Sequence, residues 1–256
     1  MSTYAFSDLH AQYGLWTQIK NFIKPEDTVY CLGDCVDRGD VGLAVLNEVM
    51  QTPNITLLRG NHEDFISSIG LEILKYDLDD GRDRYDLLSL WRINGGDDTI
   101  KDFNRLSRKE KISLVKQVNN LPTHVEYINA NGDIIYLSHA GRQPDTAEIP
   151  DTGFGSIPLN NYLWDRSHLA ETKWRGKENE YCVHGHTPIE YMYYYMMEND
   201  NVEIPKSRFE IFRYCEGHKI NIDLGSFDTH RACLLDLDTF EPIYFKDDTY
   251  LTQERE

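Results

Sequence analysis

Strand and helix patterns alternate over the first 58 residues, and this alternation limits the chain to an α/β fold. Short apolar runs at residues 3–6, 28–32 and 55–58 predict buried strands. Between them, apolar residues recur at helical spacing over 14–23 and 41–50. The resulting order of strand, helix, strand, helix, strand predicts parallel strands joined by right-handed crossovers.

The rest of the chain predicts further helices and then a second set of strands. Residues 62–119 are mainly helical in pattern, and two apolar runs flank the turn residues 129–132, which predicts a β-hairpin. We expect loops at 145–161 and 197–206, and strands at 124–128, 133–137, 181–183, 219–222, 232–237 and 242–245. Because the chain has no repeat and no low-complexity linker, we expect a single α/β domain over residues 1–256.

Composition argues against several classes of protein. Hydrophobic residues make up 40% of the 256 residues, which suffices for a sizeable core, and no apolar run is long enough to span a membrane. The net charge of −17 argues against a nucleic-acid partner, and so against a nuclease. The first residues lack a signal-peptide pattern, so we expect a cytoplasmic protein. The chain has no C-x-x-C pair, and we expect reduced, mostly buried thiols rather than a thiolate zinc site at Cys31, Cys35, Cys182, Cys215 and Cys233.

Metal-ligating side chains follow five of the predicted strands, each time beside a glycine or another small residue. Because the carboxyl ends of strands in open α/β sheets form the ligand crevice, these side chains are expected to converge. Oxygen and imidazole ligands without thiolate suit manganese, iron or zinc. Two ions about 3.5–4 Å apart that share a carboxylate would use the whole set and suit an in-line phosphoryl displacement. The set consists of Asp8, His10, Asp34, Asn61, His139 and His186.

The segments that carry these residues are SDLHA at 7–11, GDCVDRG at 33–39, GNHE at 60–63, HAG at 139–141 and GHTP at 185–188. In this order they resemble the metal-binding motifs of the phosphoprotein phosphatase family of calcineurin-like metallophosphatases. The segments 91–96 and 164–166 most resemble its small bacterial and phage-type members. The resemblance implies an αββα sandwich with a dinuclear metal site at the carboxyl ends of the strands. Ser7 and Ala11 stand where the family usually has glycine, so we expect a slightly altered first loop.

The resemblance also implies a role for each matching residue. Two divalent ions, manganese by preference with iron and zinc as alternatives, are expected to share Asp34. The first ion would be held by Asp8, His10 and Asp34, and the second by Asp34, Asn61, His139 and His186. A hydroxide between the ions would attack the phosphorus atom.

Catalytic and phosphate-binding roles follow from the same resemblance. His62 would be the general acid that protonates the leaving alkoxide, oriented and kept charged by Asp37. Arg38 and Arg166 would hold the phosphate oxygens in bidentate fashion, with Asn61 beside them.

These roles predict a metal-dependent phosphomonoesterase acting on phosphoserine and phosphothreonine in proteins, with phosphotyrosine and small phosphate esters as side activities. The main alternative is a symmetrical bis(5'-nucleosyl)-tetraphosphate hydrolase, a branch that tends to read VARG and GNHD where this chain has Asp37 and Glu63. A catalytically silent scaffold of the same fold is disfavoured because Asp34, Asn61 and His62 are all present. The sequence leaves the oligomeric state open.

Three features permit two interpretations each. His184 lies two residues before His186, so both would point the same way on an extended segment; we favour a supporting or packing role over a ligand role. The tyrosine- and methionine-rich segment 191–197 could form a substrate lid, but packing is favoured. Glu63 either orients its loop or lies on the surface.

Overall fold

The first sheet of the computed structural model is mixed and has the strand order β10-β9-β1-β2-β3. The structure describes residues 1–39, 41–75, 85–141, 161–196 and 204–249. Strands β1, β2 and β3 run parallel, whereas β9 pairs antiparallel with β1 and β10 pairs antiparallel with β9. The bounds are β1 Thr3–Phe6, β2 Thr28–Cys31, β3 Ile55–Leu57, β9 Arg231–Asp236 and β10 Pro242–Lys246.

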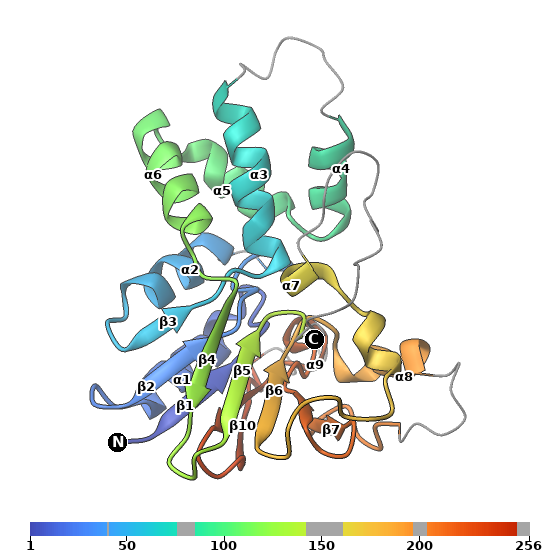
Figure 1. The fold of residues 1–256 in the computed structure, drawn as a ribbon. Helices are drawn as coiled ribbons and strands as arrows, with labels where there is room; N and C mark the ends of the chain where they lie inside the picture. The colour runs from blue at the N-terminus through green and yellow to red at the C-terminus, as the bar shows by residue number, and fades with distance from the viewer. Residues whose placement is uncertain (40, 76–84, 142–160, 197–203, 250–256) are drawn as a thin grey trace.

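The second sheet has the order β4-β5-β6-β8-β7 and faces the first (Figure 1). Its three middle strands are parallel, and each outer strand is antiparallel to its neighbour. The predicted hairpin over 129–132 is confirmed as the turn between the first two strands. The bounds are β4 His124–Ile128, β5 Ile134–Ser138, β6 Glu180–His184, β7 Phe212–Tyr214 and β8 Lys219–Asn221.

Helices α1 and α2 pack on the outer face of the first sheet, α8 and η1 lie beside β8 of the second sheet, and α3 to α6 gather beyond one edge of the first sheet (Figure 1). The predicted helical region 62–119 is confirmed within its described part as four helices. The bounds are α1 Tyr13–Phe22, α2 Gly42–Gln51, α3 Asn61–Lys75, α4 Tyr85–Ile93, α5 Asp97–Arg105, α6 Arg108–Asn119, α7 Asn161–Trp164, the 3₁₀ helix η1 Ser167–Ala170, α8 Ile189–Met196 and α9 Ser226–Thr229.

Two apolar layers hold this αββα sandwich together. The inner layer joins the facing sides of the sheets through small and aliphatic residues such as Leu32, Leu137, Val183 and Leu235. The outer layer packs the other side of the first sheet against α1 and α2, where Trp16 is fully buried. Since parallel strands from both sheets end along the same border of the sandwich, the loops that follow them meet there.

Some sequence predictions fall outside this description or differ from it. The strand β7 was not predicted, because it is only three residues long and its following turn contains no typical turn residue until Gly217. Cys215 and Glu216 adopt left-handed φ angles of 55° and 62° in that turn. The predicted loops at 145–160 and 197–203 lie outside the described residues, and Asn161 begins α7 instead of ending a loop.

The five cysteines are free and buried, as expected. Cys31 and Cys35 lie closest, with their sulfur atoms 3.4 Å apart. In the described part of the chain, none of the helices combines the length and apolar character that crossing a bilayer requires.

Candidate metal centre

Two groups of ligand atoms meet at the border of the sandwich, and Asp34 belongs to both. The first group joins His10, Asp34 and His62, and the second joins Asp34, His139 and His186. Within each group all ligand atoms lie within 4.8 Å of one another, and all of these side chains are buried. Asp34 therefore stands in the central position that the sequence predicts for a shared carboxylate.

The second group includes the predicted amide ligand. Oδ1 of Asn61 lies 2.8 Å from Nε2 of His139 and 2.9 Å from Nδ1 of His186. Oδ2 of Asp34 lies 3.3 Å from the same His139 nitrogen. The four residues predicted for the second ion thus direct one atom each into one small space.

Hydrogen bonding shows that this space favours positive charge. Nδ1 of His139 donates to the carbonyl of Leu32 at 3.0 Å, so Nε2 of the neutral ring presents a lone pair to the Asn61 oxygen. Two buried acceptors that face each other repel unless a cation lies between them. Burial disfavours a charged ring, yet the carboxylates of Asp34 and Asp8 raise the pKa of His139 to about 9. A proton on His139 Nε2 therefore lies between this nitrogen and the Asn61 oxygen, in the position that suits a metal ion.

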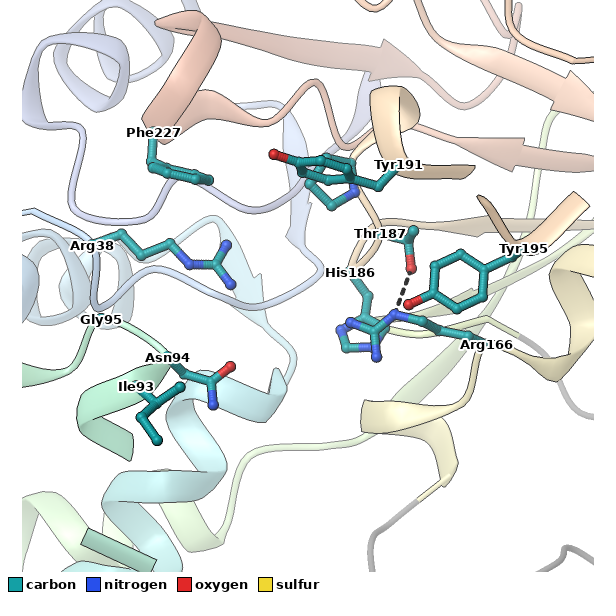
Figure 2. Close-up of a pocket in the computed structure, with 11 residues that line it drawn as sticks. Arg38, Ile93, Asn94, Gly95, Arg166, His186, Thr187, Tyr191, Tyr195 and Phe227 are labelled. Atoms are coloured by element: carbon teal, nitrogen blue, oxygen red, sulfur yellow. Dashed lines mark hydrogen bonds between the residues drawn. The ribbon is translucent and has the colours of Figure 1, made fainter. Parts of the chain in front are cut away.

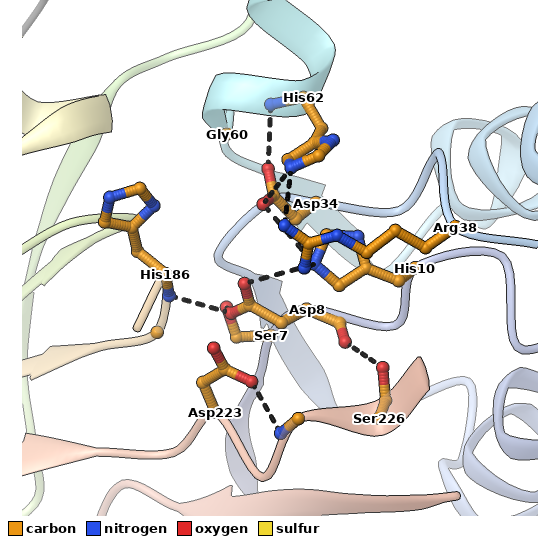
Figure 3. A network of polar contacts seen from close by, with 12 residues as sticks. Ser7, Asp8, His10, Asp34, Arg38, Gly60, His62, His186, Asp223 and Ser226 are labelled. Carbon is orange, nitrogen blue, oxygen red and sulfur yellow. Dashed lines mark hydrogen bonds and ion pairs between the residues drawn. The ribbon is translucent and has the colours of Figure 1, made fainter. Parts of the chain in front are cut away.

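The residues predicted for the first ion also lie together (Figure 3). Nε2 of His10 is 3.9 Å from Asp8 Oδ1 and 3.7 Å from Asp34 Oδ2. Its Nδ1 donates to the carbonyl of Val36 at 3.1 Å, which leaves Nε2 free to coordinate. Burial, together with Arg38, keeps the pKa of His10 well below its usual value, as a neutral ligand requires. Among the described residues, buried Asp8 Oδ1 and His186 Nε2 have no hydrogen-bond partner.

In this structure Arg38 donates to the lone pair on His10 Nε2 that the first ion would need. Its Nη1 lies 2.6 Å from His10 Nε2, and its Nη2 lies 3.2 Å from His62 Nε2. An ion bound to His10 must displace this contact, which would free the guanidinium of Arg38 to bind a ligand in the adjoining cavity. The donor set, the unpartnered atoms and the excess of acceptors fit two divalent ions.

Unusual backbone geometry brings the ligands into position. Asp8, His10, Asp34 and His186 have positive φ angles of 54°, 44°, 57° and 68°, a region that costs energy for residues with side chains. Such strain is typical of functional loops that the surrounding structure holds in place.

The glycines beside the ligands are required for close approach. A Cβ atom on Gly60 would lie 2.2 Å from Asp34 Oδ1, and one on Gly185 would lie 2.0 Å from Asp8 Oδ2. In the altered first loop the hydroxyl of Ser7 donates to the carboxylate of Asp8.

The ring of His62 lies between two carboxylates. Its Nδ1 donates to Oδ2 of Asp37 at 2.6 Å, and the opposite ring nitrogen lies 3.8 Å from Asp34 Oδ2. Trp91 also donates to Asp37 Oδ2, at 2.9 Å, and the hydroxyl of Thr99 accepts from the Asp37 amide at 3.1 Å. Asp37 is thus held from two sides while it orients the imidazole.

Glu63 connects two ligand-bearing loops. Its Oε2 accepts from the backbone amides of Asp34 at 2.7 Å and Gly60 at 2.9 Å, and its Oε1 accepts from the amide of Cys35 at 2.7 Å. Burial and the nearby Asp34 raise the pKa of Glu63 to about 7. Of the two interpretations, orientation of the loop is confirmed and a surface position is wrong.

A cavity of about 420 Å³ adjoins the cluster and contains both predicted phosphate-binding arginines (Figure 2). Arg38 and Arg166 face its interior from different sides, and His186 lies between them. Nε of Arg166 donates to the hydroxyl of Thr187 at 3.2 Å. A second, larger space of about 780 Å³ shares Arg38 and Arg166 and reaches Asp34, Asn61 and His62.

His184 does not point into the cluster. The chain turns at Gly185, so the two imidazoles diverge instead of sharing a direction as the sequence predicted. Nε2 of His184 lies 2.8 Å from the hydroxyl of Tyr214, which is also 3.1 Å from Nδ1 of His168. Burial lowers the pKa of His184 to about 3. The favoured supporting or packing role agrees with this network.

The tyrosines of α8 do not pack as the favoured interpretation expected. Met192 and Met196 occupy the core, whereas Tyr191 and Tyr195 line the cavity and remain about 40% exposed, at 42% and 41%. Residue 197, at the end of that segment, lies outside the described residues.

Sequence reasoning missed several residues at the site because they belong to no ligand pattern. Trp91 was noted only for its resemblance, yet it contacts Asp37. Asp223 lies beside Asp8, where burial and the Asp8 charge raise the pKa of Asp223 well above its usual range (Figure 3). Phe227 lines the cavity. The Asp-Leu-Gly sequence after the β8 strand was the one signal that could have located Asp223, since it again places an acid at a strand end.

A two-sheet sandwich with Asp, Asn and His ligands converging at its strand ends defines a dinuclear metallohydrolase. The sequence profile of calcineurin-like phosphoesterases matches residues 1–221, and the chain belongs to that family. The protein is therefore a metallophosphoesterase, a hydrolase whose family uses two divalent ions. No curated protein sequence matches the chain.

Solved structures share this fold at low sequence identity. A putative diadenosine tetraphosphatase is 12% identical over 95% of this chain and 92% of that chain, with a TM-score of 0.53. A protein serine/threonine phosphatase from Saccharomyces cerevisiae is 12% identical over 96% and 80%, with a TM-score of 0.51. A cold-active protein-tyrosine phosphatase of Shewanella sp. is 17% identical over 96% and 80%, with a TM-score of 0.50. At these identities the likeness concerns the fold alone.

Proposed function

We propose that this protein is a phosphomonoesterase of the phosphoprotein phosphatase branch that removes phosphate from phosphoserine and phosphothreonine in proteins. We further propose that it acts in the cytoplasm on phosphoprotein or small phosphate-ester substrates. The observation that carries this proposal is the 2.6 Å contact between His62 Nδ1 and Asp37 Oδ2 at the edge of the ligand cluster.

This contact matters because of the leaving group. A serine or threonine alkoxide is a poor leaving group and needs a proton as the bond to phosphorus breaks. Asp37 holds His62 with Nε2 directed toward the cluster, where Arg38 contacts that nitrogen in this structure. With Arg38 moved onto the phosphate and Nε2 protonated, His62 would give this proton to the ester oxygen. Fixing the ring in this orientation is the main contribution of the carboxylate.

Three other residues would bind and orient the phosphate. Arg38 and Arg166 border the same cavity, and planar guanidinium groups match phosphate oxygens in bidentate fashion. The amide of Asn61 would be directed at the same group from the base of the larger space. Together they would hold the phosphorus atom in line with the attacking water and the ester oxygen.

The metal-binding roles remain those predicted from the sequence. Two divalent ions, manganese by preference, would be held by the six ligands of the cluster. When bound, they supply the charge that stabilises the phosphoryl group and acidify the attacking water.

Hydrolysis of a dinucleoside tetraphosphate is the second candidate, favoured by the size of the larger cavity. Two observations argue against it. Asp37 stands where the hydrolase branch tends to have alanine, and in this structure it holds the proposed acid. Among the described residues that line the two cavities, Arg38 and Arg166 are the only guanidinium or ammonium groups, few for a tetraphosphate chain.

The experiment that tests this proposal is a paired initial-rate assay in manganese, with and without a chelator. A phosphoserine peptide and diadenosine tetraphosphate serve as the two substrates. We expect chelator-sensitive release of phosphate from the peptide and much slower hydrolysis of the dinucleotide. Preference for the dinucleotide would contradict the assignment and move the function to nucleotide metabolism. Inactivity toward both substrates in protein that binds manganese would favour a scaffold.

A further inference from the structure

The cavity beside the arginines is a slot with apolar walls. Figure 2 shows Phe227 and Tyr191 on one side and Ile93 on the opposite side, with the guanidinium groups facing the space between them. Ile93 is 83% exposed, so its side chain is accessible to a ligand in the slot. A ligand that covers this wall removes its apolar surface from water, which favours binding.

An aromatic ring also contacts the guanidinium group of each arginine. The guanidinium carbon of Arg38 lies 5.0 Å from the centre of the Phe227 ring, and that of Arg166 lies 5.7 Å from the centre of the Tyr195 ring. These contacts are within the range of cation–π attraction. They place aromatic surface directly next to the position where phosphate would bind.

The position of the apolar walls next to the arginines discriminates between occupants. A phosphoserine side chain carries one methylene between phosphate and backbone, and would leave the walls formed by Ile93 and Tyr191 in water. In a nucleotide, the ribose separates the ring from the phosphate, so the ring would lie farther from the arginines. A ring bonded directly to the ester oxygen would lie between the walls while its phosphate contacts Arg38 and Arg166.

We propose that this slot, lined by Ile93, Tyr191 and Phe227, is a subsite that binds the ring of aryl phosphate monoesters, phosphotyrosine side chains included. This inference rests on the proposed phosphomonoesterase activity at the same site. Water attacks phosphorus, the bond between phosphorus and the aryl oxygen breaks, and the phenol and inorganic phosphate leave. His62 supplies the proton that the phenol oxygen takes, and recovers one from the attacking water.

The first test compares two peptides of identical sequence, one with phosphotyrosine and one with phosphoserine, on manganese-loaded enzyme. Substituting Tyr191→Ala should raise KM for the phosphotyrosine peptide roughly three- to tenfold, the effect of one aromatic contact, and leave KM for the phosphoserine peptide nearly unchanged. Tyr193→Ala is the matched control, because Tyr193 has the same 42% exposure on α8 but does not line the slot. Equal effects of the two substitutions would overturn the assignment of the subsite. An unchanged ratio of the KM values for the two peptides in Tyr191→Ala would also overturn it.

The second test needs no turnover. Phenylphosphonate and methylphosphonate are titrated calorimetrically into the manganese-loaded protein, since neither can be hydrolysed. We expect the phenyl compound to bind more tightly, and the difference to shrink in Tyr191→Ala but persist in Tyr193→Ala. Equal binding of the two compounds would overturn the subsite, as would tighter binding of adenosine monophosphate than of phenylphosphonate. A protein that discriminates the phosphonates but cleaves no peptide would disprove the proposed function and leave the subsite standing.

Discussion

Oε2 of Glu63 accepts a hydrogen bond from the backbone amide of Asp34 at 2.7 Å, so a side chain from the first turn of α3 holds the backbone of the loop after β2. The same carboxylate accepts from Gly60 and Cys35. Glu63 touches none of the proposed substrate positions, yet it sets where the shared metal ligand lies. The geometry of the site therefore depends on residues that bind neither metal nor phosphate.

Replacing Glu63 tests this dependence. In Glu63→Gln one acceptor oxygen becomes a donor, which must face a backbone amide, and the loop that carries Asp34 loses its position. We expect manganese affinity to fall about 10- to 100-fold, the usual cost of losing a residue that orients ligands. Metal content after dialysis measures this. Glu241→Gln, at an exposed site, is the control; equal retention of manganese in both variants would refute the positioning role.

Asp34→Asn tests the shared carboxylate itself. The amide carries no negative charge and cannot bridge two cations as a carboxylate does. We expect hydrolysis of a phosphoserine peptide to be abolished and the manganese content to fall. Full activity in a variant that keeps its metal would rule out the bridging assignment.

His62→Asn tests the proposed acid through the leaving group. A phosphoserine peptide releases a basic alkoxide, whereas nitrophenyl phosphate releases an ion that needs no proton. General acid catalysis contributes about 10²- to 10⁴-fold, so we expect a loss of that size on the peptide and a much smaller one on nitrophenyl phosphate. Equal losses on both substrates would point to a binding role for His62.

Tyr214→Phe probes the buried network behind the cluster. The hydroxyl of Tyr214 lies between His184 and His168, and both imidazoles would lose this partner. Leaving buried polar groups unpaired costs about 1–3 kcal/mol, so the free energy of unfolding should fall by that amount in urea denaturation. Tyr244→Phe, in which the lost hydroxyl accepts one exposed contact from the Ile211 amide, should change stability less. A Tyr214→Phe protein as stable as wild type would mean that the network adds nothing to stability.

Glu48 gives a prediction for pH dependence away from the metal centre. Hydrogen bonds from Lys20, Tyr13 and Trp16 lower the pKa of Glu48 to about 2, below the usual 4.5. Because the folded-state pKa is the lower one, the stabilisation is complete above pH 4.5 and is lost as the pH falls toward 2. The ion pair between Lys20 and Glu48 is near the surface and screened by solvent. Glu48→Gln should therefore lower the free energy of unfolding by roughly 0.2–1 kcal/mol at pH 7.

Thermal unfolding of the two proteins at pH 7 and pH 2.5 measures this difference. The wild type should be more stable at pH 7, and the two melting temperatures should approach each other at pH 2.5. A difference that stays constant with pH would show that Glu48 acts through packing rather than charge.

Local patterns were enough for every described strand except β7, and for the polar side chains that lie together at the strand ends. The alternation of strand and helix patterns over residues 3–58 predicted the parallel strands β1, β2 and β3. This worked because the spacing and length of an apolar run show directly which residues of a segment are buried. The antiparallel directions of β9 and β10 left no local signal, since the same residues suit either direction. Phe227 was missed as a cavity residue, and packing was favoured over a lid for Tyr191, because nothing local distinguishes an aromatic ring that lines a slot from one that packs.

Residue type and spacing are sufficient to predict the α/β class and the polar residues at five strand ends. The surroundings of those residues follow from tertiary packing: the Trp91 contact to Asp37, the three amides held by Glu63, the divergence of His184 from His186, and the slot beside the arginines. Each of these joins segments far apart in the chain. Such contacts depend on how the sheets and helices pack, and packing is a property of the whole fold rather than of any one segment.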